Sequence, residues 1–210
     1  MVGRYLSFLC TITTAIAEYC LAYKAVITRK STIFARCLVH FAHNSPLYLF
    51  KMTLQPKLLQ WFCLPYEGLC LAQLYDLLSL RQQVFVVEQQ CVFLDTDCKD
   101  QTAWHLLGYT SGGDLAAYCR LLPPDLAYIG YTSIGRVATH TDHRGQKYGH
   151  ELMRRAIAFL SQQFPDYPIR IGAQNYLLRF YAAWGFVADG EPYIEDGIWH
   201  TEMVRHTRTP

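Results

Sequence analysis

The chain has 210 residues, a formal net charge of +2 and 51% hydrophobic residues. This length allows one domain with a full hydrophobic core and an appendage, and the composition excludes disordered and fibrous proteins. Because the net charge is so small, nothing supports nucleic-acid binding, and we expect no nucleic-acid partner.

The first 51 residues differ from the rest of the chain in charge. They hold six Lys or Arg and one acid, a net charge of +5, whereas residues 52–210 hold thirteen Lys or Arg and sixteen acids, a net charge of −3. An apolar stretch at 5–17 has the length of a signal-peptide core and is shorter than a membrane span. We expect an atypical extension over 1–51 and the functional domain over 52–210. Three origins of the extension stay open: translation from upstream of Met52, a signal or anchor, and a divergent natural extension.

Cysteine and histidine patterns bear on the compartment and on metals. The eight cysteines contain no C-x-x-C pair, so we expect reduced, mostly buried thiols and a cytoplasmic protein. His140 and His143 lie close together on a predicted loop. A histidine pair with this spacing is usually solvated, and we expect no metal site.

The first half of the domain alternates strands with a helix. Residues 58–64 predict a strand that ends at Pro65, and residues 71–85 have the apolar spacing of a helix. Residues 104–110 and 115–122 flank Ser-Gly-Gly-Asp and predict an antiparallel hairpin.

The second half continues with a strand over 133–140 and a helix that stops near Pro165. The expected buried face of this helix comprises Leu152, Met153, Ala156, Ile157, Leu160 and Phe164. Residues 169–174 predict a buried strand, and residues 176–184 a helix that Gly185 ends. A terminal antiparallel pair completes the pattern, which is typical of a mixed α/β sheet with helices packed on it.

A short glycine-containing loop, Arg-Gly-Gln-Lys-Tyr-Gly over 144–149, directly precedes the long helix. Glycines let the backbone approach a ligand closely, and a helix N-terminus offers unpaired N–H groups and the positive end of a dipole. The loop therefore predicts an anion site with Arg144 and Lys147 as supporting cations.

Several motifs in order resemble the GNAT superfamily of N-acetyltransferases. The stretches "IGRVATHTDHRGQKYGHELM", "IRIGAQ" and "LLRFYAAWGF" resemble its cofactor half, and "LYDLLSLRQQVFVVEQQC", "LDTDCKD" and "YIEDGIWH" resemble its ElaA-like branch. The resemblance covers about residues 61–205. It implies the acyl-CoA N-acyltransferase fold, an α/β fold whose mixed, mostly antiparallel sheet has splayed parallel strands and flanking helices, with acetyl-CoA as co-substrate.

The resemblance implies that the loop binds the pyrophosphate of acyl-coenzyme A, although Lys147 stands where the family usually has glycine. The backbone before the loop would pair with the pantetheine arm. The implied cofactor-binding residues are Val137, Ala138, Thr139, Arg144, Gly145, Gln146, Lys147, Tyr148, Gly149 and Gln174, with Asn175 as a neighbouring candidate for the last.

The resemblance also implies catalytic residues. Tyr181 would donate a proton or hydrogen bond to the departing thiolate, and Glu88 would accept a proton from the amine. Tyr181 could equally be a packing residue, and Glu88 a surface glutamate.

Acceptor-side residues are predicted from their charge. Asp95 and Asp97, with Asp100 in the same run, could bind a cationic amine or could simply be solvated. His200 is a candidate substrate-binding residue, and both His200 and His105 could carry protons or be structural.

We therefore expect an N-acetyltransferase that transfers acetyl from acetyl-CoA to a small primary amine by direct attack. Two alternatives stay open: a non-catalytic coenzyme A-binding regulatory module and an acyltransferase like the acyl-homoserine-lactone synthases. We expect a core domain that is not membrane-bound. The identity of the amine and the oligomeric state are open, a homodimer being one candidate.

Overall fold

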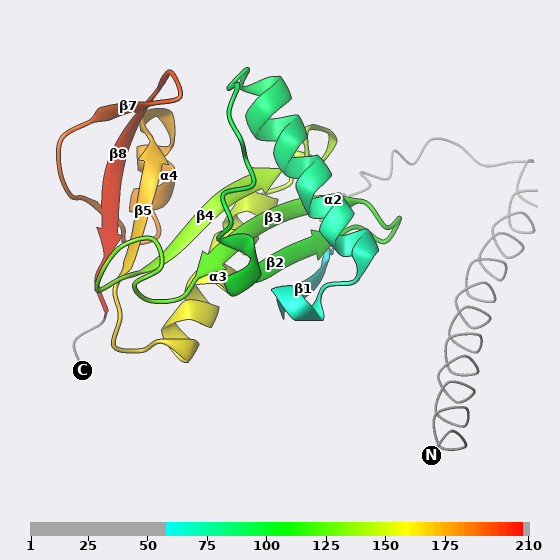
Figure 1. Ribbon diagram of the computed structural model, residues 1–210, viewed down its shortest axis with the longest axis horizontal. Helices are drawn as coiled ribbons and strands as arrows, with labels where there is room; N and C mark the ends of the chain where they lie inside the picture. The colour runs from blue at the N-terminus through cyan, green and yellow to red at the C-terminus, as the bar shows by residue number, and fades with distance from the viewer. Residues whose placement is uncertain (1–57, 208–210) are drawn as a thin grey trace, which may run out of the picture. The chain divides into compact units, whose positions relative to one another are not determined.

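The computed structural model describes residues 58–207 (Figure 1). The expected extension and the boundary between residues 51 and 52 lie outside this range and stay predictions. No helix in the described range is long and apolar enough to cross a membrane.

Within residues 58–207 one sheet contains eight strands in the order β1-β2-β3-β4-β5-β8-β6, and β7 pairs with β8. The bounds are β1 (Gln60–Pro65), β2 (Trp104–Tyr109), β3 (Leu115–Leu122), β4 (Thr132–Thr139), β5 (Ile169–Gln174), β6 (Val187–Ala188), β7 (Tyr193–Glu195) and β8 (Ile198–Arg205). The pairing of β4 with β5 is parallel, and every other pairing is antiparallel. The predicted mixed, mostly antiparallel sheet is confirmed.

Helices cover both faces of the sheet (Figure 1). The helix α2 (Leu71–Arg81) and the π-helical segment η2 (Gln82–Glu88) pack on β2, β3 and β4. The opposite face carries α3 (Tyr148–Gln163) and the short α4 (Leu178–Ala182). Four 3-10 turns complete the described chain: η1 (Tyr66–Gly68), η3 (Asp100–Thr102), η4 (Thr141–His143) and η5 (Asn175–Leu177).

The buried face of α3 follows from its apolar spacing. Five of the six predicted residues are buried against the sheet, namely Leu152, Met153, Ala156, Ile157 and Leu160, and Phe164 packs on them. The helix ends at Gln163 because Phe164 precedes Pro165 and takes a non-helical conformation. This packing places the N-terminus of α3 at the end of β4.

The parallel strands β4 and β5 separate soon after they start. They pair at Thr132 with Ile169 and at Ser133 with Arg170. Further along, β4 contains a bulge, with Arg136 at φ +52° and a shift in its register with β3. The predicted splay of these two strands is confirmed.

Two helices differ from their predicted extents. The helix expected over 71–85 is α-helical to Arg81 and π-helical from Gln82 to Glu88. The helix expected over 176–184 consists of η5 and the five residues of α4. Gly185 has φ +83° and follows this short helix, as predicted.

Candidate functional site

The loop between β4 and α3 forms an open pocket of about 280 Å³. Its backbone is left-handed at Gly145 (φ +76°) and Lys147 (φ +62°), which turns the chain sharply into α3. Six predicted cofactor residues line the pocket, namely Thr139, Arg144, Gly145, Lys147, Tyr148 and Gly149. His143, which the sequence analysis considered only as one of a close histidine pair, and His150 also line it. Since the first turn of α3 is part of the lining, the helix dipole favours an anion here.

Lys147 takes the conformation that usually selects glycine at this position. A left-handed non-glycine residue costs roughly 1–2 kcal/mol, so the lysine needs a compensating role. Its side chain caps no backbone group of α3. Among residues 58–207 its ammonium has no ion-pair partner, and it can therefore serve an anion in the pocket.

The edge of β4 that faces β5 offers backbone groups beyond the last pairing at Ser133. On its other edge β4 stays bonded to β3, with Ala138 opposite Tyr118 and Thr139 opposite Ala117. One carbonyl on this stretch is engaged, since Arg144 Nε donates to the Thr139 oxygen at 3.2 Å. An extended, amide-bearing ligand has the groups to pair with such an edge.

The far side of the opening ends at Gln174, the last residue of β5. Its side-chain amide exchanges contacts with the Gln89 amide at 3.2 and 3.5 Å, and it accepts a hydrogen bond from the Tyr176 hydroxyl. The neighbouring candidate Asn175 instead accepts a hydrogen bond from Thr201 at 2.8 Å. The chain after η2 is thus tied to the end of β5.

Tyr181 lies in the core between α4 and the sheet. Its ring packs edge-on against Phe180 and Phe186, with ring centroids 5.1 and 6.1 Å away. Burial raises the pKa of Tyr181 well above its ordinary value, so the phenol keeps its proton at neutral pH. Its hydroxyl has no hydrogen-bond partner within residues 58–207, which leaves a proton available to a ligand atom.

Glu88 lies at the end of η2 and faces the loop. Its two carboxylate oxygens accept hydrogen bonds from Arg144 Nη1 and Nη2 at 2.7 and 2.8 Å, and Thr141 Oγ1 donates to it at 3.2 Å. The hydrogen bond with Arg144 lowers the pKa of Glu88. A carboxylate with a lowered pKa is a weaker base. The Glu88 carboxylate is also paired with Arg144, the cation that was predicted to bind phosphate.

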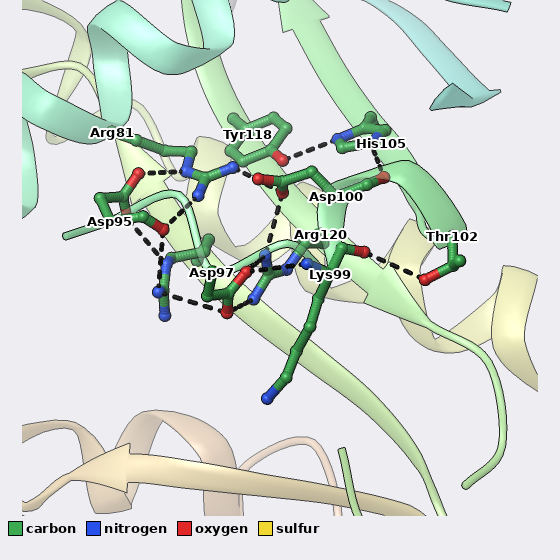
Figure 2. Close-up of polar contacts among 10 residues, drawn as sticks. Arg81, Asp95, Asp97, Lys99, Asp100, Thr102, His105, Tyr118 and Arg120 are labelled. Carbon is green, nitrogen blue, oxygen red and sulfur yellow. Dashed lines mark hydrogen bonds and ion pairs between the residues drawn. The ribbon is translucent and has the colours of Figure 1, made fainter. Parts of the chain in front are cut away.

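Asp95 and Asp97 lie in an internal ion-pair network (Figure 2). Asp95 is buried and accepts hydrogen bonds from Arg81 Nε at 2.7 Å and Arg136 Nε at 2.8 Å. Asp97 is bonded by both Nη atoms of Arg120. The alternative that these side chains are simply solvated is therefore wrong, because arginines of α2, β3 and β4 donate hydrogen bonds to their oxygens.

Asp100 completes the network beneath α2. Its Oδ1 atom accepts from Arg81 at 2.7 Å and from Arg120 at 2.9 Å. Its carbonyl contacts His105 Nε2, whose other ring nitrogen meets the Tyr118 hydroxyl at 2.8 Å. Burial lowers the pKa of His105, so this histidine is neutral and structural. Three aspartates and three arginines then balance in charge and hold the 89–103 segment on the sheet.

Sequence reasoning missed the three arginines of this network. Arg120 stands within the apolar stretch "LAAYCRLL", and an arginine in a buried strand needs a partner. That was the available signal. For metals, no group of three or more His, Cys, Asp or Glu side chains within residues 58–207 is arranged to hold an ion.

Comparisons with known proteins agree with this geometry. The profile described as "Acetyltransferase (GNAT) domain" matches residues 84–206. The ElaA protein of Escherichia coli is 40% identical over 70% of this chain and 97% of its own length. A UPF0039 protein of Synechocystis is 40% identical over 62% of this chain and 84% of its own.

Solved structures are similar as well. An acyl-CoA N-acyltransferase from Pseudomonas aeruginosa has a TM-score of 0.67 and 41% identity, covering 70% of this chain and 99% of that one. The crystal structure of Escherichia coli ElaA has a TM-score of 0.67 and 39% identity, covering 71% of this chain and 100% of that one. The fold is thus the acyl-CoA N-acyltransferase fold. The chain belongs to the GNAT acetyltransferase family, in its ElaA-like branch.

The buried ion pairs predict how stability depends on pH. Burial alone would raise the pKa values of Asp97 and Asp100, but hydrogen bonds and attraction from Arg81 and Arg120 outweigh it and lower both. Their contribution is therefore complete above the ordinary aspartate pKa of about 3.9 and is lost as the pH falls through the lowered folded-state values.

We expect Asp100→Asn to reduce the free energy of unfolding by roughly 3–5 kcal/mol at pH 7, because it leaves buried guanidinium groups unpaired. The difference from wild type shrinks as the pH falls below about 4. Denaturant unfolding at several pH values measures both effects, with exposed Asp166→Asn as the control. Unchanged stability in Asp100→Asn would contradict the assigned role of the network.

The Glu88–Arg144 contact predicts competition with a phosphate ligand. Both side chains are about 40% exposed, and a pair this exposed contributes about 1 kcal/mol or less. Glu88→Gln should therefore strengthen acetyl-CoA binding modestly, by about twofold to fivefold, in calorimetric titration, whereas Glu67→Gln should leave it unchanged. Weaker binding by Glu88→Gln would instead mean that Glu88 holds Arg144 in its binding position.

Proposed function

We propose that this protein transfers an acetyl group from acetyl-CoA to a small primary amine, and that residues 52–210 carry the activity. The observation that carries the proposal is the separation of β4 from β5 directly beside the anion pocket at the N-terminus of α3. The donor has this shape and chemistry, since an extended arm with amide groups leads to a pyrophosphate.

The donor is placed by the chain's own groups. Backbone groups of Val137, Ala138 and Thr139 pair with the pantetheine arm, and Gln174 lies across the opening. The loop from Arg144 to Gly149 holds the pyrophosphate through backbone N–H groups, with Gly145 and Gln146 shaping the turn. Phosphate takes over the Arg144 guanidinium from Glu88, which requires only that a weak, exposed ion pair opens.

The amine attacks the thioester carbonyl directly. A C–N bond forms, the tetrahedral intermediate collapses, and the C–S bond breaks. Tyr181 donates its proton to the departing sulfur, for which its protonated and unpartnered phenol is suited. The amine approaches on the sheet face that carries His200. Asp95 and Asp97 do not contact the acceptor, because arginines engage their oxygens. They act indirectly, by holding the 89–103 segment in place beside it.

Thiol release from acetyl-CoA in the presence of a panel of primary amines tests this function. The full chain should release thiol with at least one amine. Tyr181→Phe should lower kcat roughly 100-fold or more without weakening acetyl-CoA binding, while exposed Tyr75→Phe should behave as wild type. Acetyl-CoA binding without thiol release by any amine would favour the non-catalytic coenzyme A-binding module.

A further inference from the structure

His200 lies on the sheet face opposite Tyr181. Side chains alternate along a strand, and Met203 of β8 is buried in the core that contains Tyr181 and α3. His200 is therefore directed to the other face, where it stands in register with Gln174 at the end of β5. Neighbouring strands are about 4.8 Å apart, so the opening between β4 and β5 lies about two strand spacings, roughly 10 Å, from β8. An acceptor amine that lies over β5 on this face bridges that distance to the ring.

The hydrogen bond of His200 fixes which nitrogen carries the proton. Nδ1 lies 2.9 Å from the carbonyl oxygen of Ile198. A carbonyl can only accept, so Nδ1 is the donor, and in the neutral ring Nε2 then holds a free lone pair. Within residues 58–207, Nε2 has no hydrogen-bond partner. The ring is thus prepared to accept a proton at one defined atom.

The orientation of His200 is supported by Tyr193 of β7. The two rings stack with centroids 5.9 Å apart and an interplanar angle of 26°. The Tyr193 hydroxyl extends over β5 to Gly172, where an added Cβ would lie 3.0 Å from it. A residue without a side chain at position 172 therefore lets Tyr193 lie across β8 and hold the imidazole in place.

The other acceptor-side groups are already engaged. Both oxygens of Glu88 are bonded to Arg144, and Asp95 and Asp97 are bonded to buried or half-buried arginines. Both ring nitrogens of His105 have partners. Within residues 58–207, His200 Nε2 is a neutral acceptor nitrogen on this side that has no hydrogen-bond partner and is not paired with an arginine.

We propose that His200 is the general base of the reaction, an inference that rests on the proposed acetyl transfer. The attacking amine gives a proton to His200 Nε2 as the C–N bond forms. On the opposite face the C–S bond breaks, and the thiolate takes the Tyr181 proton. The imidazolium and phenolate that result return to their starting states by exchanging a proton through solvent. The split sheet thus separates base from acid.

The test compares kcat, KM and acetyl-CoA affinity of the full chain for wild type, His200→Gln, His200→Ala and the matched control His206→Gln, an exposed histidine beyond β8. His200→Gln should lose kcat roughly 100-fold or more with unchanged acetyl-CoA affinity. Added imidazole should restore part of the activity of His200→Ala, a response that a purely structural role would not give. His206→Gln should match wild type.

Three results would overturn the assignment. If His200→Gln keeps wild-type kcat, the base is elsewhere while the acetyl transfer stands. If His200→Ala loses activity and imidazole does not rescue it, the ring has a structural role. If wild type itself transfers acetyl to no amine, the proposed function fails, and the assignment of His200 fails with it.

Discussion

The strands β4 and β5 pair at two positions and then separate, and the candidate site depends on this separation. A parallel pair that continued would close the edge of β4 with ladder hydrogen bonds and leave no opening. The bulge at Arg136 lies beyond the last pairing, at Ser133, on the stretch of β4 that borders the opening. Its left-handed conformation is unfavourable for a residue with a side chain, so it needs support from tertiary contacts.

That support comes from the buried ion-pair network. Arg136 donates to both the carboxylate and the carbonyl of Asp95, and Arg81 holds the same aspartate from α2. A balanced set of buried charges is not a general source of stability. The network does require a defined arrangement of side chains, because each hydrogen bond forms only when donor and acceptor are in the correct positions. We infer that the acids of the 89–103 segment fix the shape of the opening and do not themselves bind a cationic acceptor.

Local patterns in the sequence were sufficient to predict most of the fold. The 3.6-residue spacing in α3, the glycine turn before β3 and the glycine after α4 are each encoded within a few residues, and the structure follows them. The pocket residues Arg144 and Lys147 were predictable for the same reason, since a loop and the helix that it starts are neighbours in sequence.

Long-range side-chain pairing was not predictable in this way. Asp95 meets Arg136 across 41 residues, and Glu88 meets Arg144 across 56. No local spacing signals such contacts, so acids that look free in the sequence are occupied in the fold. Likewise, the free Nε2 atom of His200 follows from one hydrogen bond that only the strand geometry reveals.

Calorimetric titration of acetyl-CoA into the full chain tests the central claim most directly, with Arg144→Ala/Lys147→Ala as the comparison. The account predicts micromolar binding by wild type and binding weaker by roughly tenfold or more in the variant, because charge-assisted hydrogen bonds to phosphate are lost. Equal affinity of the two proteins, or no binding by a folded wild type, would contradict the assignment of the loop and of the opening beside it.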